Sequence, residues 1–401
     1  MKKPQMPSPD ADAQQASRQL LERIRAGIEL RGGWTGFDEY MQCALYEPGL
    51  GYYSGGARKF GPSGDFVTAP QISPLFGRTL ARQCRQWFEQ VPARILEFGA
   101  GTGELAAQLL GELSLESPDG GADAAITDLE YLIVEVSAEL RERQQQTLSE
   151  LPPQVLARVR WLDHLPESIE GVVIGNELLD AMPVRLFRVA DGALFERGVC
   201  LQGDQLAFED RPADPMFAAE LEALLTQVWG PRADWPAEYV SETCVQAQAW
   251  IREIGTRLVR GAVLLIDYGF PQAEYYHQHR SAGTLMCHYR HFAHPDPFFW
   301  PGLQDITAHV NFSAVTQAAE ATGLECLGYL GQARLLMNLG LLDLLARVPT
   351  DRVADYLPAV QAVKRLLTEA EMGELFKAIA FGRGLPDDAI GFLAGDRRGA
   401  L

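Results

Sequence analysis

Short apolar runs alternate with amphipathic stretches through the middle of the chain. Runs that are apolar throughout predict buried strands, and apolar residues at intervals of three and four predict helices. The strands are expected at 95–98, 131–137, 159–163, 171–177 and 261–269, and the helices at 14–31, 74–89, 138–148 and 244–258. Strands of this kind, separated by helices, are typical of a largely parallel sheet that helices cover on both faces. We therefore predict an α/β fold.

Two segments depart from this alternation. Residues 184–210 alternate polar and apolar positions, with turn residues at Asp191-Gly192 and Gly203-Asp204, which predicts an antiparallel insertion. From about Gln332 the tail reads as helical, and its run LLMNLGLLDLL is apolar all round, as in a buried helix or, alternatively, a homodimer interface. The predicted organisation is an N-terminal helix and Gly/Tyr-rich arm (1–73), a core (74–331) with the insertion at about 184–243, and a helical C-terminal segment (332–401).

The composition narrows the choice of partners. Of the 401 residues, 47% are apolar and 22% are charged, as in a globular protein, and the net charge of −18 opposes binding to nucleic acid. An acidic chain instead suits a cationic partner, such as an arginine-bearing protein segment; the alternative is that the charge serves only solubility. The cysteines form no CxxC pair, which favours a reducing compartment. No run approaches the roughly 18 apolar residues of a membrane span, so we expect no membrane insertion and a cytoplasmic location.

A glycine-rich loop follows the first predicted strand of the core. Gly99, Gly101 and Gly103 precede a helix that is expected to begin at Glu104. Glycines at this place let the backbone turn tightly and bring the N–H groups of the helix close to a ligand. A dinucleotide-binding loop would have glycine at position 104, where this chain would direct a carboxylate at a pyrophosphate. NAD and FAD are therefore disfavoured.

The spacing of these glycines, with Glu97 two residues before the first, resembles motif I of the class I S-adenosylmethionine-dependent methyltransferases. The resemblance implies S-adenosyl-L-methionine as the cofactor, with Glu97, Gly99, Gly101 and Gly103 among the residues that bind it. Glu135, at the end of the next strand, is predicted to accept hydrogen bonds from the ribose hydroxyls. Asp163, after the third strand, is predicted to contact the adenine amine. For both acids the alternative is an ordinary carboxylate at a strand end or in a surface loop.

Several dispersed segments carry a narrower resemblance. They are YMQCALYEPGLGYY (40–53), GPSGDFVTAPQISPLFG (61–77), ILEFGAGTGELA (95–106), IGNELLDAMPVR (174–185), IDYG (266–269), GTLMCHYRH (283–291) and DITAHVNFSAV (305–315). Together they resemble the MidA family of methyltransferases, whose mitochondrial members assist assembly of the respiratory NADH dehydrogenase and symmetrically dimethylate an arginine of one subunit. The resemblance implies a protein substrate that carries an arginine, with a respiratory-complex subunit as one candidate. Met286 stands where the family pattern most often has Arg, so that side chain's role does not transfer.

Polar residues end the fourth predicted strand, beside the first strand, where sheets of this kind bind ligands. They are Asn176, Glu177 and Asp180. If a helical turn starts after Gly175, Glu177 and Asp180 share one face and grip a guanidinium, with Asn176 on the cofactor side. These two carboxylates are the predicted catalytic pair. In the alternative, Asp180 is a helix cap or an ion-pair partner and Glu177 holds the cofactor's amino group.

Weaker patterns suggest three further site residues, which are His291, Asp65 and Thr68. His288, His291 and His294 recur at intervals of three, but no Cys or acid at ligand spacing completes the set, so we predict no metal site. His291 is assigned as a catalytic substrate contact or proton acceptor, with a loop hydrogen bond as the alternative. Asp65 and Thr68 follow a glycine turn and are assigned to the cofactor pocket, with a structural Asx or ST turn as the alternative.

These patterns favour one function over two others. We expect S-adenosylmethionine-dependent methylation of an arginine side chain in a protein. The first alternative is a small-molecule O- or N-methyltransferase, which a compact apolar pocket would favour. The second is an assembly chaperone that binds the cofactor without turnover.

Overall fold

The computed structural model describes residues 6–55, 67–115, 126 and 128–401. The chain divides into two compact units, which are described separately. We call them the arm unit (Met1–Phe66, Asp180–Gln248 and Phe270–Asn311) and the sheet unit (Val67–Leu179, Ala249–Gly269 and Phe312–Leu401). This division differs from the predicted boundaries, because the insertion after the fourth strand groups with the N-terminal arm, and the C-terminal segment groups with the sheet.

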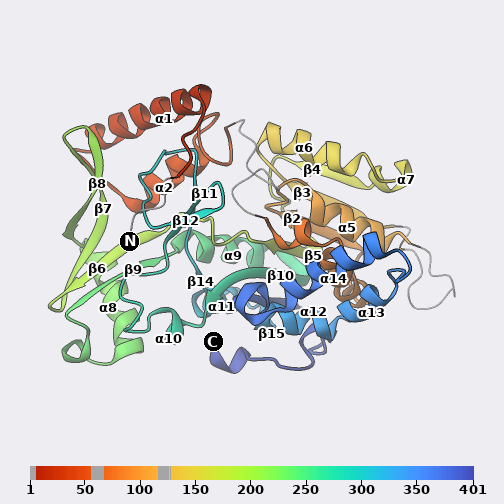
Figure 1. Cartoon of the computed structure of the whole chain (residues 1–401). Helices are drawn as coiled ribbons and strands as arrows, with labels where there is room; N and C mark the ends of the chain where they lie inside the picture. Colours follow the sequence, from red (N-terminus) through yellow and green to blue (C-terminus); the bar gives the residue numbers. More distant parts are fainter. Residues whose placement is uncertain (1–5, 56–66, 116–125, 127) are drawn as a thin grey trace. The chain divides into compact units, whose positions relative to one another are not determined.

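The sheet unit is built on a mixed sheet (Figure 1). In spatial order its strands are β15 (Glu325–Gly331), β16 (Phe376–Arg383), β10 (Leu258–Phe270), β5 (Ile169–Asn176), β2 (Arg94–Phe98), β3 (Glu130–Val134) and β4 (Val159–Leu162). The pairs from β10 to β4 are parallel, whereas β16 is antiparallel to both of its neighbours. The five strands predicted from apolar runs are therefore confirmed. Their carboxyl ends meet at one edge of the sheet, where ligands bind in folds of this kind.

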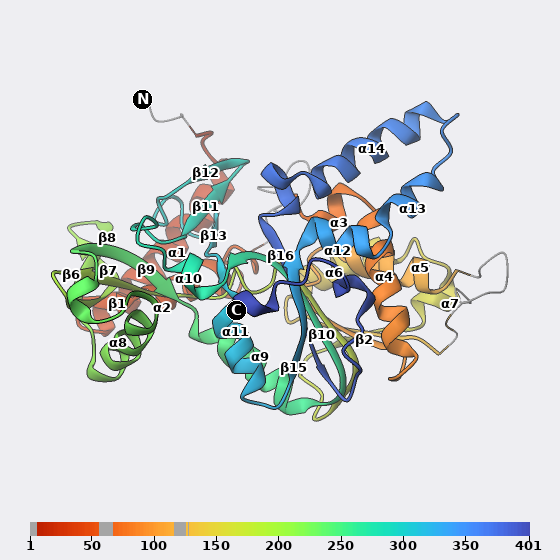
Figure 2. The ribbon, with the colours of Figure 1, turned by 90° about the horizontal axis from the view of Figure 1, so that it is seen from below.

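Helices cover both faces of this sheet. Figure 2 shows α4 and α5 on one side and α9 and α11 on the other. The helices are α3 (Ala69–Ile72), α4 (Leu75–Phe88), α5 (Glu104–Leu113), α6 (Ala138–Leu148), α7 (Pro153–Leu156), α9 (Val245–Arg257), α11 (Phe312–Glu320), α12 (Gln332–Asn338), α13 (Leu341–Ala346) and α14 (Val353–Leu367). Residues such as Leu80, Leu109 and Ile133 are fully buried in one core cluster between sheet and helices. The helical spacing of buried residues on α4 explains why this face packs on the sheet.

The C-terminal segment is not purely helical, and this corrects our prediction. Residues 376–383 form β16, which inserts between β10 and β15. The apolar run LLMNLGLLDLL is also broken, because Gly340 adopts a left-handed φ of +77° between α12 and α13. Leu335 and Leu344 are buried within the unit, which supports the first alternative for this run. The homodimer stays a prediction.

The arm unit contains the antiparallel insertion that the sequence predicts. The sheet order is β1 (Trp34–Gly36), β7 (Ala193–Gln202), β6 (Arg185–Ala190) and β9 (Glu238–Thr243), with β8 (Gln205–Pro212) beside β7. The turns at 191–192 and 203 have positive φ, as expected for tight hairpins. The other elements are α1 (Ala11–Leu30), α2 (Phe37–Tyr46), α8 (Pro215–Trp229), η1 (Arg232–Asp234), α10 (Gln272–Tyr275), β11 (Met286–Tyr289), β12 (Phe292–His294), β13 (Asp305–Thr307) and β14 (Val310–Asn311).

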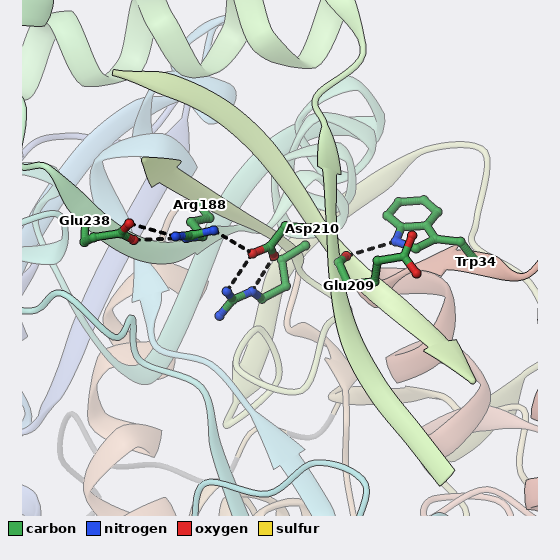
Figure 3. A network of polar contacts seen from close by, with 6 residues as sticks. Trp34, Arg188, Glu209, Asp210 and Glu238 are labelled. Carbon is green, nitrogen blue, oxygen red and sulfur yellow. Dashed lines mark hydrogen bonds and ion pairs between the residues drawn. The ribbon is translucent and has the colours of Figure 1, made fainter. Parts of the chain in front are cut away.

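A polar network crosses the strands of the insertion (Figure 3). Arg188 on β6 donates to Glu238 on β9 at 2.7 and 3.0 Å and to Asp210 on β8 at 3.3 Å. Arg197 on β7 donates to both oxygens of Asp210 at 2.7 and 2.9 Å. Because each partner comes from a different strand, the network favours one strand register.

No helix in the described parts of the chain has both the length and the apolar character needed to cross a membrane.

Candidate active site

The glycine loop lies where the sequence predicts it, between β2 and α5. Gly99, Gly101 and Gly103 have φ values of +65°, +52° and +86°, which L residues rarely adopt. The helix begins at Glu104, as predicted. A methyl group added to Gly101 would meet no atom within 4 Å, whereas one on Gly103 would lie 3.2 Å from Gln144 Cα. The loop is therefore packed on one side and open at its middle glycine.

Glu135 follows β3 at the same edge of the sheet. The residue is 8% exposed, and its carboxylate accepts hydrogen bonds from the Ser137 N–H at 2.8 Å and from Gln144 Nε2 at 3.1 Å. Burial raises the pKa of Glu135, and the bonds from Ser137 and Gln144 oppose that rise. Gln144 also donates to the Gly101 carbonyl at 3.1 Å. This buried amide on α6 therefore ties the acid to the glycine loop.

Asp163 lies just beyond β4 and is exposed. Its carboxylate pairs with Arg141 at 2.5 Å, and Arg141 also donates to the Glu135 carbonyl at 2.6 and 2.8 Å. The same guanidinium reaches the Leu162 carbonyl at 3.1 Å. Arg141 therefore joins the ends of β3 and β4. A contact between Asp163 and adenine stays a prediction.

Glu97 points into the core of the sheet unit. The residue is 2% exposed, and its carboxylate accepts a hydrogen bond from the Tyr131 hydroxyl at 2.8 Å. Burial raises the pKa of Glu97 to about 7. The residue precedes the loop by two positions, as motif I has it, and its contact with the cofactor stays a prediction.

The end of β5 has a different conformation from the predicted helical turn. Glu177 has a left-handed φ of +51°, and no helix forms over 177–180. The backbone bonds explain this, because the Glu177 N–H donates to the Ile266 carbonyl at 2.8 Å, and the next two N–H groups donate to the Asp267 carboxylate. The shared helical face that we predicted for Glu177 and Asp180 is therefore wrong.

The side chains of Asn176 and Glu177 lie at this strand end. Asn176 Nδ2 donates to Glu177 Oε1 at 3.2 Å, and the Ala69 N–H donates to the same oxygen at 3.4 Å. Asn176 Oδ1 is buried and has no hydrogen-bond partner among the described residues. A buried amide oxygen without a donor is costly, so this atom suits a ligand that brings an N–H group.

Thr68 precedes α3, a short helix whose hydrogen bonds reach both the end of β5 and the glycine loop. The Thr68 N–H donates to Gln71 Oε1 at 3.3 Å, and Gln71 Nε2 lies 3.5 Å from Thr102 Oγ1 in the glycine loop. Thr68 thus occupies a helix-capping position, which favours the structural alternative, and its contact with the cofactor stays a prediction. Asp65 lies outside the described residues.

Two predicted catalytic residues belong to the arm unit. Asp180 is 5% exposed, and its carbonyl accepts from the Ala308 N–H at 3.0 Å. Burial, then Asp305 and then Asp180 raise the pKa of Tyr46. His291 is exposed in the two-residue loop between β11 and β12, where its φ is +66°. Their roles toward a substrate stay predictions.

Asp267, Gln144 and Gln71 were not predicted from the sequence. Asp267 lies within β10, near its carboxyl end, in the segment IDYG, which we used only for the family resemblance. Gln144 stands in the run QQQ, where no pattern distinguishes it from its neighbours. In the described part of the chain, no group of three or more His, Cys, Asp or Glu side chains is placed to hold a metal ion.

The residues of the sheet unit fit S-adenosylmethionine. The open side of Gly101 leaves space beside backbone N–H groups at the start of α5, Glu135 offers a carboxylate for hydroxyls, and Asn176 Oδ1 offers an acceptor for an ammonium group. No phosphate-binding residue is needed for this ligand. A glycine loop after β2, an acid after β3 and a polar end of β5 define an α/β S-adenosylmethionine-dependent methyltransferase.

The comparisons with known proteins agree with this class. A family model described as "Putative S-adenosyl-L-methionine-dependent methyltransferase" matches residues 79–330, and the chain belongs to this family. A crystal structure from Burkholderia thailandensis bound to S-adenosyl-homocysteine is 49% identical, with 99% of this chain and 100% of that chain covered and a TM-score of 0.91. The predicted α/β methyltransferase fold is thereby confirmed. S-Adenosylmethionine is the cofactor.

Curated relatives extend the match. "Protein arginine methyltransferase NDUFAF7 homolog, mitochondrial" of Drosophila melanogaster is 26% identical, covering 95% of this chain and 89% of its own length. "Protein arginine methyltransferase NDUFAF7, mitochondrial" of Rattus norvegicus is 29% identical, covering 90% of this chain and 84% of its own length. These matches confirm the resemblance found in the sequence. Because the relatives are named as mitochondrial, they point away from the cytoplasmic location that we expected, and that expectation is corrected.

Proposed function

We propose that this protein transfers the methyl group of S-adenosylmethionine to an arginine side chain of a protein substrate. The names of the curated relatives support the arginine and the protein substrate. A subunit of a respiratory complex is the candidate substrate. The net charge of −18 suits a cationic target. The observation that carries the proposal is the placement of Asn176 and Glu177 in the same unit as the glycine loop, at the carboxyl end of the adjacent strand β5.

The protein itself forms no covalent bond in this reaction. The bound cofactor supplies a methyl group on a sulfonium, so its leaving group is neutral. An arginine nitrogen attacks the methyl carbon, the carbon–sulfur bond breaks, and the nitrogen loses one proton to a base or to water. The chain must therefore align the nitrogen with the methyl group and offset the repulsion between two cations.

Glu177 is the residue that we assign to this alignment. Its Oε1 accepts from Asn176 and from the Ala69 N–H, which orients the carboxylate, and a carboxylate binds a guanidinium through charge-assisted hydrogen bonds. Asp180 is assigned as the second carboxylate toward the guanidinium. Asn176 is assigned to the cofactor through Oδ1, together with Gly99, Gly101, Gly103 and Glu135.

Paired measurements on the same variants test these assignments. In Glu177→Gln and Asp180→Asn, the affinity for S-adenosyl-homocysteine should stay within about threefold, while methyl transfer falls by about two orders of magnitude because the guanidinium loses its charged partner. Glu130→Gln is the matched control, since its carboxylate pairs with Arg94 and Arg160 at the opposite end of β3. Loss of cofactor affinity in Glu177→Gln would move that residue to the cofactor site. Wild-type transfer by both folded variants would contradict the substrate role.

A further inference from the structure

Asp267 has a buried carboxylate that accepts hydrogen bonds from backbone N–H groups. It lies near the end of β10 and is 1% exposed. Its Oδ2 accepts from the N–H groups of Leu178 at 3.1 Å and Leu179 at 2.8 Å, and its Oδ1 accepts from the N–H of Tyr268 at 2.9 Å. Burying a carboxylate is expensive unless donors surround it. These three bonds supply donors, and two of them come from the segment that follows Glu177.

The bonds fix a backbone that would otherwise be unfavourable. Glu177 has a φ of +51°, a conformation that costs a non-glycine residue free energy and persists where the surroundings impose it. Its N–H is held by the Ile266 carbonyl at 2.8 Å, and the two following N–H groups are held by Asp267. Three successive residues after β5 are thus anchored to two successive residues of β10. This anchor determines where the Glu177 side chain leaves the strand.

Leu178 connects the same anchor to the glycine loop. A methyl group on Gly99 would lie 3.2 Å from Leu178 Cδ1, and one on Gly175 would lie 2.8 Å from Leu178 Cδ2. The leucine therefore packs against the first glycine of the loop and the end of β5. A shift of the Leu178 backbone would move Glu177 and would also open the packing behind Gly99.

We propose that Asp267 is a positioning residue of the methyl-transfer site, which acts by holding Glu177 in its left-handed conformation. The proposal rests on the proposed role of Glu177. Asp267 itself contacts neither substrate nor cofactor in this account. Its carboxylate, rather than a side chain of similar size, is required because both oxygens accept from backbone N–H groups.

A double-mutant cycle tests the proposal. Asp267→Ala should lower kcat for methyl transfer about ten- to hundredfold, the loss expected when hydrogen bonds to a charged acceptor disappear. In the Glu177→Gln background the same change should cost less than about threefold, because there is no carboxylate left to position. Asp267→Asn should recover part of the activity, since its amide oxygen can still accept from Leu178 and Leu179 while its NH2 group opposes the N–H of Tyr268.

Hydrogen exchange gives a readout that does not depend on activity. In Asp267→Ala the amides of Leu178 and Leu179 should exchange at least about tenfold faster, while amides in the centre of β5 stay protected. Asp396→Asn is the matched control, since Asp396 also accepts from two backbone N–H groups, those of Tyr329 and Arg398, both at 3.0 Å. It should leave transfer and the exchange of both leucine amides unchanged.

The outcomes separate two failures. If Asp267→Ala costs the same factor with and without Glu177, or if the two leucine amides keep their protection, the positioning role is wrong while the proposed function stands. If Glu177→Gln transfers methyl groups at the wild-type rate, the assignment of Glu177 fails, and the positioning role fails with it.

Discussion

Replacing Glu97 with Gln should stabilise the protein, and should do so more strongly as the pH rises. Glu97 is 2% exposed on β2, and it accepts a hydrogen bond from the Tyr131 hydroxyl at 2.8 Å. Burial raises the pKa of its carboxyl group from 4.5 to about 7, and the bond from Tyr131 offsets part of that rise. A glutamine keeps an acceptor for the tyrosine and carries no charge to bury.

The pKa difference sets the magnitude and the sign. Below about pH 4.5 both the folded and the unfolded chain hold the proton, so Glu97 has no effect on the free energy of unfolding. Between about pH 4.5 and pH 7 the unfolded chain releases the proton first, so stability falls as the pH rises. Above about pH 7 both states are ionised, and the full loss is about 3 kcal/mol. Protonated Glu97 therefore stabilises the folded state fully at low pH, and this stabilisation is lost as the pH rises to the pKa of the folded state.

Urea unfolding of the wild type and of Glu97→Gln at several pH values measures this effect. From about pH 5.5 to about pH 8.5 the wild type should lose about 2 kcal/mol relative to the variant. Glu130→Gln is the control, because this carboxylate lies on the neighbouring strand and its side chain is 36% exposed. If the free energy of unfolding has the same pH dependence in the wild type and in Glu97→Gln, burial does not raise the pKa of Glu97, and the prediction is wrong.

Three further predictions concern single contacts. Gly101→Ala should cost about 1 kcal/mol of stability, because φ is +52°, and should reduce the affinity for S-adenosyl-homocysteine at least about tenfold in calorimetry, since the methyl group enters the open side of the loop. Glu135→Ala should weaken the cofactor about ten- to hundredfold in the same assay, and unchanged affinity would remove Glu135 from the ribose site. Burial acts to raise the pKa of Asp210, but its bonds to Arg197 and then to Arg188 lower that pKa from its ordinary value of 3.8. The network should therefore stabilise the folded protein above about pH 4, and this stabilisation should be lost as the pH falls further. An Asp210→Asn variant whose acid unfolding matches that of the wild type would contradict this.

The glycine loop could be predicted because its cause is local. Three glycines at alternate positions, a strand before them and a helix after them leave few backbone conformations, and the observed φ values are all positive. The parallel strands were predictable for a similar reason, since a run that is apolar throughout has to be buried on both faces. Glu135 followed from the end of one such run.

The turn after β5 was not predictable from its own residues. The sequence GNELLD is compatible with a helical turn, and we predicted one. The structure instead bends this segment because its N–H groups find acceptors at Ile266 and Asp267, about ninety positions away along the chain. The strand β16 was not predicted, for a related reason. Its place between β10 and β15 depends on two distant strands, whereas the helical residues before it suggested that the helix pattern continued.

The most direct test of the proposed function is the identity of the methylated product. The protein would be incubated with methyl-labelled S-adenosylmethionine and host lysate, and the labelled species would be identified by mass spectrometry, with Glu177→Gln in parallel. We expect label on an arginine side chain of a protein, and far less label with Glu177→Gln. Label confined to small molecules, or cofactor binding without any labelled product, would contradict it.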